Sequence, residues 1–176
     1  MASAYILHLL LIRKLRFITH AEMKRRFLLH VSSLLSLDDL SQFSSTMKKH
    51  LNPLVIDSIS NYKKHGYSVV VSSAAPNLYI DIIIAKLCPF IDYVISTPTP
   101  DAPSNKEWIE NIGENKKYKT MSFLKKKNLT FSVFYTDHYD DLPLLMMEKE
   151  KNYLVNPSSK TKFVLDAEHI EYKMIL

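Results

Sequence analysis

Positions 131–145 read FSVFYTDHYDDLPLL, and they carry the strongest fold signal in the chain. The first five residues are aromatic, β-branched or serine, a composition typical of a buried strand. Three acids follow within five residues, at Asp137, Asp140 and Asp141. Clustered carboxylates repel one another and therefore favour a bound hard cation, and Mg²⁺ takes one or two carboxylates together with water and substrate oxygens. The alternative is a plain loop, with Asp140 or Asp141 capping a helix and His138 exposed.

Short strand-like and helix-like segments alternate on both sides of this stretch. Strands are predicted around 67–72, 93–95 and 153–155, where β-branched and aromatic residues gather. Helices are predicted over about 76–88 and 116–127, with a short one after the acids. This alternation predicts an α/β fold with a Rossmann-like, mostly parallel sheet. Ligands of such sheets bind at the carboxyl ends of the strands.

The first 65 residues are predicted to be helical instead. Three helix starts are marked by residues that commonly cap helices, at Thr19, Ser36 and Asn52. The change from purely helical segments to alternating strands and helices predicts that the chain has two structural parts. We expect a helical segment over 1–52 and the core that contains the sheet over 53–176.

Two further groups have residues that can bind an anion. Ser73 and Ala74 come where a strand gives way to a helix beginning at Pro76, and the N–H groups of a helix start can hold an anion. Lys116, with Lys117 beside it, begins a basic helix and can reach a phosphate as a point charge. Each signal is weak alone, because a simple strand–helix cap and a solvated helix face would look the same.

The composition excludes several classes of protein. The chain has 176 residues, 2 glycines, 1 cysteine and a net charge of +5. Two glycines cannot build the glycine-rich phosphate loops, and the single Cys88 excludes an internal disulfide framework or a multi-cysteine zinc site. No apolar run reaches about 18 residues, so we expect no membrane span. We interpret the positive charge as a solvated lysine surface and expect a cytoplasmic protein without nucleic-acid or membrane partners, a basic nucleic-acid binder being the alternative.

Taken in chain order, these motifs resemble those of the haloacid dehalogenase superfamily, in its phosphoserine-phosphatase-like branch. The resemblance implies that Ser73, with Ala74, binds the transferring phosphoryl group of a small phosphorylated substrate, or free phosphate. It implies that Lys116 balances phosphate and carboxylate charge. It also implies a Mg²⁺ site at Asp137 and Asp141, with the first carboxylate as ligand and the second supporting the metal or the lysine.

The resemblance covers about 51–163 and implies Mg²⁺-dependent phosphomonoester hydrolysis through an aspartyl-phosphate. The family's first motif, Asp-x-Asp-x-Thr, ends its central strand and supplies the nucleophile and the general acid and base. No such motif precedes Ser73, where the acids are Glu22, Asp38, Asp39 and Asp57. We therefore expect the chain to be inactive or nearly so as it stands.

The missing motif leaves two interpretations of the chain. It is either a piece of a longer hydrolase or a catalytically dead module that binds phosphate or a protein partner. The helices over 1–52 would then be the remnant of the family's helical cap. The place of the central strand could be taken by Tyr5–Ile12 or left to a partner. We favour a helix for Tyr5–Ile12, because leucine is abundant there.

Overall fold

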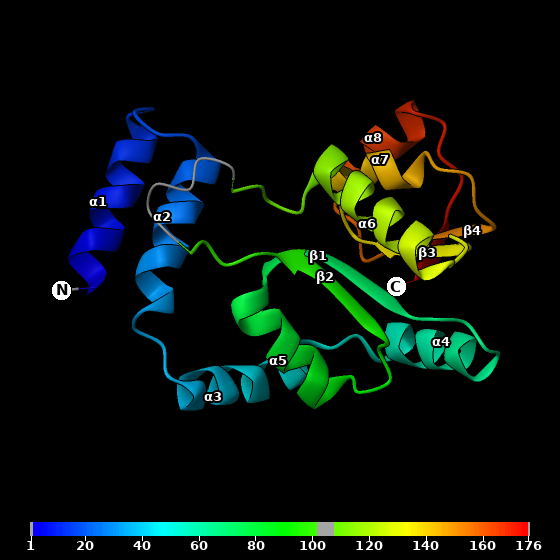
Figure 1. The fold of residues 1–176 in the computed structure, drawn as a ribbon. Helices are drawn as coiled ribbons and strands as arrows, with labels where there is room; N and C mark the ends of the chain where they lie inside the picture. The colour runs from blue at the N-terminus through cyan, green and yellow to red at the C-terminus, as the bar shows by residue number, and fades with distance from the viewer. Residues whose placement is uncertain (1, 102–107, 176) are drawn as a thin grey trace.

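The computed structural model describes residues 2–101 and 108–175, and it is helical through Lys64 before helices and strands alternate (Figure 1). The helices are α1 (Ala2–Lys14), α2 (His20–Ser32), α3 (Leu37–Met47), α4 (Pro53–Lys64), α5 (Asn77–Leu87), α6 (Gly113–Lys127), α7 (Leu142–Leu145) and α8 (Ser159–Ala167), with short 3-10 turns η1 (Lys48–His50) and η2 (Tyr139–Asp141). The strands are β1 (Val70–Pro76), β2 (Tyr93–Thr97), β3 (Val133–Thr136), β4 (Lys151–Val155) and β5 (Lys173–Ile175). Within the described ranges, no helix is long and apolar enough to cross a membrane.

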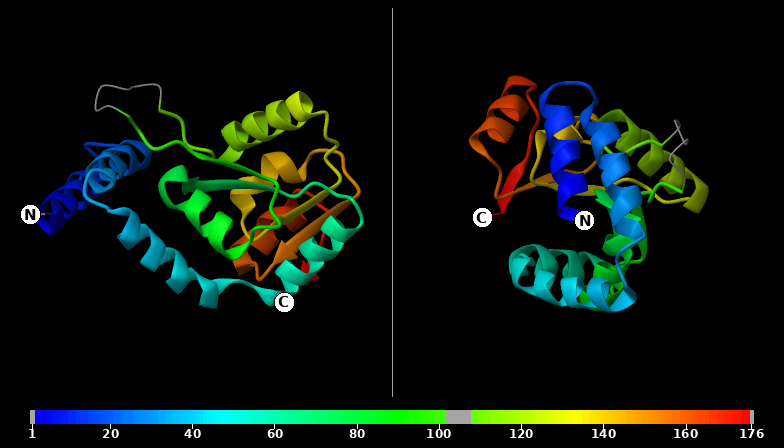
Figure 2. Two further views of the ribbon diagram at one scale, coloured as in Figure 1. Left: turned by 60° about the horizontal axis from the view of Figure 1, so that its bottom comes forward. Right: turned by 90° about the vertical axis from the view of Figure 1, so that its left-hand side faces the viewer.

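The strands form two parallel sheets rather than one. β1 pairs with β2, while β3, β4 and β5 make the second sheet in that order. The parallel pairing and the helices between the strands confirm the predicted α/β fold. No described strand joins β1 to β3, so the sheet is divided between them. Figure 2 shows α1 and α2 at one end of the molecule.

Helix α6 contacts the first sheet and the turn that follows β3, and these contacts show the direction of the strands relative to the helix. Lys116, in its first turn, contacts Asp141 just after β3. Near the other end of the helix, two side chains contact the ring of Tyr93 at the start of β2. The ring of Phe123 lies 5.1 Å from it, centroid to centroid, and the ammonium group of Lys127 lies over it. Because β2 starts beside the carboxyl end of α6 and β3 follows that end, β1, β2 and β3 all run opposite to α6. Their carboxyl ends therefore lie on the same side of the molecule.

The three predicted helix starts are confirmed. Thr19 Oγ1 accepts a hydrogen bond from the Glu22 backbone nitrogen at 3.1 Å. Ser36 and Asp39 cap α3 reciprocally, with 3.1 Å from the Asp39 nitrogen to Ser36 Oγ and 2.9 Å from the Ser36 nitrogen to the Asp39 carboxylate. Asn52 caps α4 through its side-chain oxygen. Such caps are visible in the sequence because they depend on neighbouring residues only.

The first strand differs from its prediction in both ends. It was predicted over 67–72 and runs over Val70–Pro76. Pro76 was predicted to open the following helix, but it is the last residue of β1 and the N-cap of α5, with φ −63° and ψ 141°. The ring of proline fixes only φ, and this value suits an extended residue as well as a helical one. The segment α8 and the strand β5 were not predicted.

The apolar run Tyr5–Ile12 lies inside α1, which confirms the preference for a helix. Leu9 is 2% exposed, and the ring of Tyr5 lies 4.5 Å from that of His30 on α2. Part of the run is thus used in packing α1 against α2, whereas Leu7, Leu10 and Leu11 are exposed. It does not fill the gap between β1 and β3.

Candidate active site

The centre of the candidate site is a buried ion pair at the carboxyl end of β3. Lys116 on α6 pairs with Asp141 at the end of η2, and the two residues are only 8% and 9% exposed. Thr136, the last residue of β3, donates a hydrogen bond to the other carboxylate oxygen of Asp141 at 2.7 Å. Asp141 therefore has an ammonium group on one oxygen and a hydroxyl on the other.

The other acids of the loop lie at the surface. His138 and Asp140 contact each other, with 3.3 Å between His138 Nδ1 and an Asp140 carboxylate oxygen. The Asp137 side chain is exposed, and no described side chain bonds to its carboxylate. Asp137 is therefore the acid of this loop that is open to a ligand from outside.

A second polar group lies at the carboxyl end of β1. Ser73 Oγ accepts a hydrogen bond from the Ala75 backbone nitrogen at 3.1 Å. The neighbouring Ser72 Oγ lies 2.8 Å from Thr120 Oγ1, on the turn of α6 that follows Lys116. One helix thus ties the end of β1 to the ion pair after β3.

Asn111 and Lys24 hold the end of β1 in place, and neither was predicted from the sequence. Asn111 is fully buried, and its side-chain nitrogen donates to the carbonyl oxygen of Ser73 at 3.0 Å. Lys24 reaches over from α2, donates to the carbonyl oxygen of Ala74 at 3.1 Å and pairs with Glu110. Both are isolated polar residues without a motif around them, so only the tertiary fold reveals their role.

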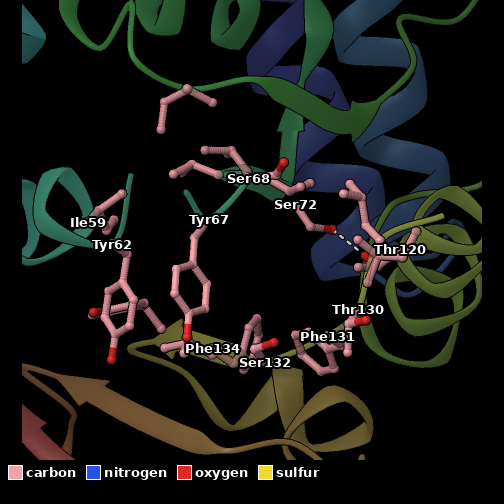
Figure 3. Close-up of a pocket in the computed structure, with 18 of the residues that line it drawn as sticks. Ile59, Tyr62, Tyr67, Ser68, Ser72, Thr120, Thr130, Phe131, Ser132 and Phe134 are labelled. Carbon is pink, nitrogen blue, oxygen red and sulfur yellow. Dashed lines mark hydrogen bonds between the residues drawn. The ribbon is translucent and has the colours of Figure 1, made fainter. Parts of the chain in front are cut away.

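A cavity of about 570 Å³ opens between the two sheets (Figure 3). Residues 68–72 line one wall and 129–135 line the other. Thr120 and Asp141 line the cavity at the end where β1 and β3 have their carboxyl ends. Figure 3 shows Tyr67 reaching from one wall toward the other. Of the polar groups described above, Ser72, Thr120 and Asp141 line the cavity, whose walls are otherwise largely apolar.

A sequence model of the haloacid dehalogenase-like hydrolase family matches residues 2–146. The chain belongs to this family. Among solved structures, this HAD-like chain is similar to the crystal structure of a protein with unknown function from Bordetella pertussis Tohama I, with a TM-score of 0.71 and 17% identity over 96% of this chain and 79% of that chain. At this identity the likeness concerns the fold. No curated protein matches the chain.

The residues predicted for the HAD-like site fall into two groups. Lys116 and Asp141 are in contact, with Asp137 on the same loop, whereas Ser73 and Ala74 lie near the end of β1. The geometry also separates the two candidate lysines. The Lys117 side chain is 35% exposed and lies 3.8 Å from Glu114 on its own helix. Lys116, not Lys117, thus faces the acids of the loop.

The fit of the site to Mg²⁺ rests on the two predicted acids. Within the described residues, no group of three or more His, Cys, Asp or Glu side chains is placed to hold a metal ion. Mg²⁺ commonly keeps several waters and uses one or two carboxylates. The open carboxylate of Asp137 fits that role, whereas both oxygens of Asp141 already have protein partners. These residues fit a largely hydrated, weakly held Mg²⁺ with Asp141 in support.

Proposed function

We propose that this HAD-like chain carries the phosphate- and Mg²⁺-binding part of a phosphomonoester hydrolase of the phosphoserine-phosphatase-like kind, and that it lacks its own nucleophile. The observation that carries the proposal is the buried pair of Lys116 and Asp141 at the carboxyl end of β3. Burying two charges is expensive even when they are paired, so such a pair is a poor device for stability alone. Its place at the strand end is where α/β sheets bind their ligands.

The phosphate would be held by Ser73, Lys116 and the start of α5. Because Ser73 Oγ accepts a hydrogen bond from the Ala75 nitrogen, its own O–H remains able to donate to a phosphate oxygen. Lys116 supplies a positive charge that Asp141 orients. The first turn of α5, which follows directly, adds N–H groups that favour an anion.

Asp137 would hold the metal through its open carboxylate. When bound, Mg²⁺ supplies positive charge that stabilises the phosphoryl oxygens during transfer. Asp141 contributes indirectly, because Thr136 and Lys116 hold its carboxylate in a single orientation. This division of roles is the one that the family resemblance implies for Asp137 and Asp141.

A covalent route needs a carboxylate that attacks phosphorus, and the acids before β1 are placed elsewhere. In α2, the pKa of Glu22 is lowered to about 2, mainly by its hydrogen bonds from Arg25. The carboxylate of Glu22 is thus already paired within its own helix. Asp39 caps α3, and Asp57 lies on α4. None of them stands at the carboxyl end of a strand. We therefore propose that the chain binds phosphate without turning over a phosphate ester.

Titration of the chain with inorganic phosphate in the presence of Mg²⁺, followed by ³¹P NMR, tests the binding roles. Ser73→Ala is expected to weaken phosphate affinity about tenfold or more, because a hydrogen bond to a charged group contributes roughly 1.5–3 kcal/mol. Asp137→Asn is expected to remove the dependence of phosphate affinity on Mg²⁺. The matched control is Ser159→Ala, at an exposed serine of α8, which should leave the affinity unchanged. Equal affinities for the wild type, Ser73→Ala and Ser159→Ala would contradict the assignment.

A further inference from the structure

Two unpaired strand edges face each other across the cavity. β1 and β3 are each the outer strand of their sheet, and both line the same space of about 570 Å³. Figure 3 looks into it, with Ser68 and Ser72 on one side and Ser132 and Phe134 on the other. An edge strand presents a row of N–H and C=O groups that can pair with another strand.

On β1, the backbone groups of Val70 and Ser72 face the cavity. The preceding residue, Val69, directs both of its groups toward β2: its carbonyl accepts from the Tyr93 nitrogen at 3.2 Å, and its N–H donates to the Asp92 carboxylate at 2.8 Å. Consecutive residues of a strand direct their backbone groups to opposite edges. Val70 and Ser72 therefore offer their N–H and C=O groups to the open side.

The same reasoning applies to β3. The carbonyl of Ser132 accepts hydrogen bonds from the backbone nitrogens of Glu150 and Lys151, at 2.9 and 3.2 Å, and so faces β4. Val133 and Tyr135 then direct their backbone groups into the cavity. Because β1 and β3 both run opposite to α6, a segment inserted between them can be parallel to both.

The side chains of the cavity favour a neutral, apolar occupant. Among the described lining residues, the only acid is Asp141 and there is no lysine or arginine; Asp141 and His65 stand at the ends, and Lys116 balances Asp141. Residues 70–75 of β1 are only half-buried. Parallel sheets are normally covered on both faces, so the surface of β1 lacks part of its cover.

We propose that the cavity is an acceptor site for one extended segment of another polypeptide, which inserts between β1 and β3 and runs parallel to both. The segment would be about five residues long, the usual length of a strand, with an uncharged apolar centre to match the uncharged walls. Its backbone would pair with Val70 and Ser72 on one side and with Val133 and Tyr135 on the other. The chain's own apolar run, Tyr5–Ile12, is not the occupant, because it is packed in α1. The proposal does not depend on phosphate binding.

Binding of a fluorescein-labelled peptide, followed by fluorescence anisotropy without phosphate or Mg²⁺, tests the proposal. The probe has five alternating valines and isoleucines between flanking lysine pairs. Two control peptides carry N-methyl groups on the odd or on the even central residues, so that each loses the N–H groups of one edge. A strand held on both sides should be weakened by either methylation, each by about tenfold or more. The proposal is overturned if the probe does not bind, or if only one methylation pattern weakens it.

The site of binding is checked on the protein. Ser132→Trp, which fills the cavity from the β3 side, should abolish binding of the peptide, whereas Ser159→Trp on the exposed surface of α8 should not. In the wild type, bound peptide should slow hydrogen exchange at the amides of Ser72 and Tyr135. Protection of these two amides that rises with protein concentration alone would show a second copy as the occupant and would overturn the proposal.

Discussion

Replacing Lys116 with methionine is expected to lower the free energy of unfolding by about 3–5 kcal/mol, because it leaves the carboxylate of Asp141 buried without its cation. The loss exceeds the value of a surface ion pair, which is usually below about 1 kcal/mol. Urea unfolding at neutral pH measures it. Thr136 would still donate one hydrogen bond to Asp141, but a hydroxyl does not neutralise a carboxylate.

The adjacent lysine provides the matched control. Lys117→Met removes a half-exposed side chain with only a 3.8 Å contact to Glu114, so its effect should stay within about 0.5 kcal/mol. The double variant Lys116→Met, Asp141→Leu should recover most of the loss, because two apolar side chains can replace a buried pair. If Lys116→Met costs no more than Lys117→Met, the pair is not buried as described.

The second large effect concerns catalysis. The chain alone is expected to hydrolyse p-nitrophenyl phosphate with Mg²⁺ no faster than buffer, because removing the nucleophile of a covalent mechanism commonly costs a factor of about 10⁴ or more. Lys116 and the metal can stabilise charge, but they cannot form the covalent intermediate. Release of p-nitrophenol over hours measures the rate.

A variant separates genuine turnover from contamination in that assay. Asp137→Ala should release p-nitrophenol at the same background rate as the wild type. Turnover in the wild type that Asp137→Ala abolishes would mean that the chain contains a nucleophile after all. The chain would then be an active hydrolase rather than a binding module.

Local signals account for the parts of the structure that were predicted correctly. The caps at Thr19, Ser36 and Asn52 depend on residues close together in the chain. So do the strands predicted over 93–95 and 131–135, which are found over 93–97 and 133–136. The contact of Lys116 with Asp141 was expected only through the family resemblance. Its burial depends on α6 packing beside β3, which no local pattern reports.

Other features depend on distant contacts and could not be predicted. Asn111 and Lys24 hold the end of β1 although they lie in different parts of the sequence. The division of the sheet leaves no mark on β1 or β3 themselves, because an edge strand and an inner strand share the same apolar residues. The missing acidic motif suggested that the central strand is absent. That the open edges of β1 and β3 face each other is visible only in the three-dimensional structure.

Hydrogen exchange of the free chain, measured by NMR residue by residue, tests that division directly. The amides of Ser72 and Tyr135, which face the cavity, are expected to exchange on the order of 100-fold faster than those of Val71 and Phe134, which face β2 and β4. Equal protection of all four amides would show that a strand already lies between the two sheets. That result would contradict both the proposed acceptor site between β1 and β3 and the proposal that the active site is incomplete.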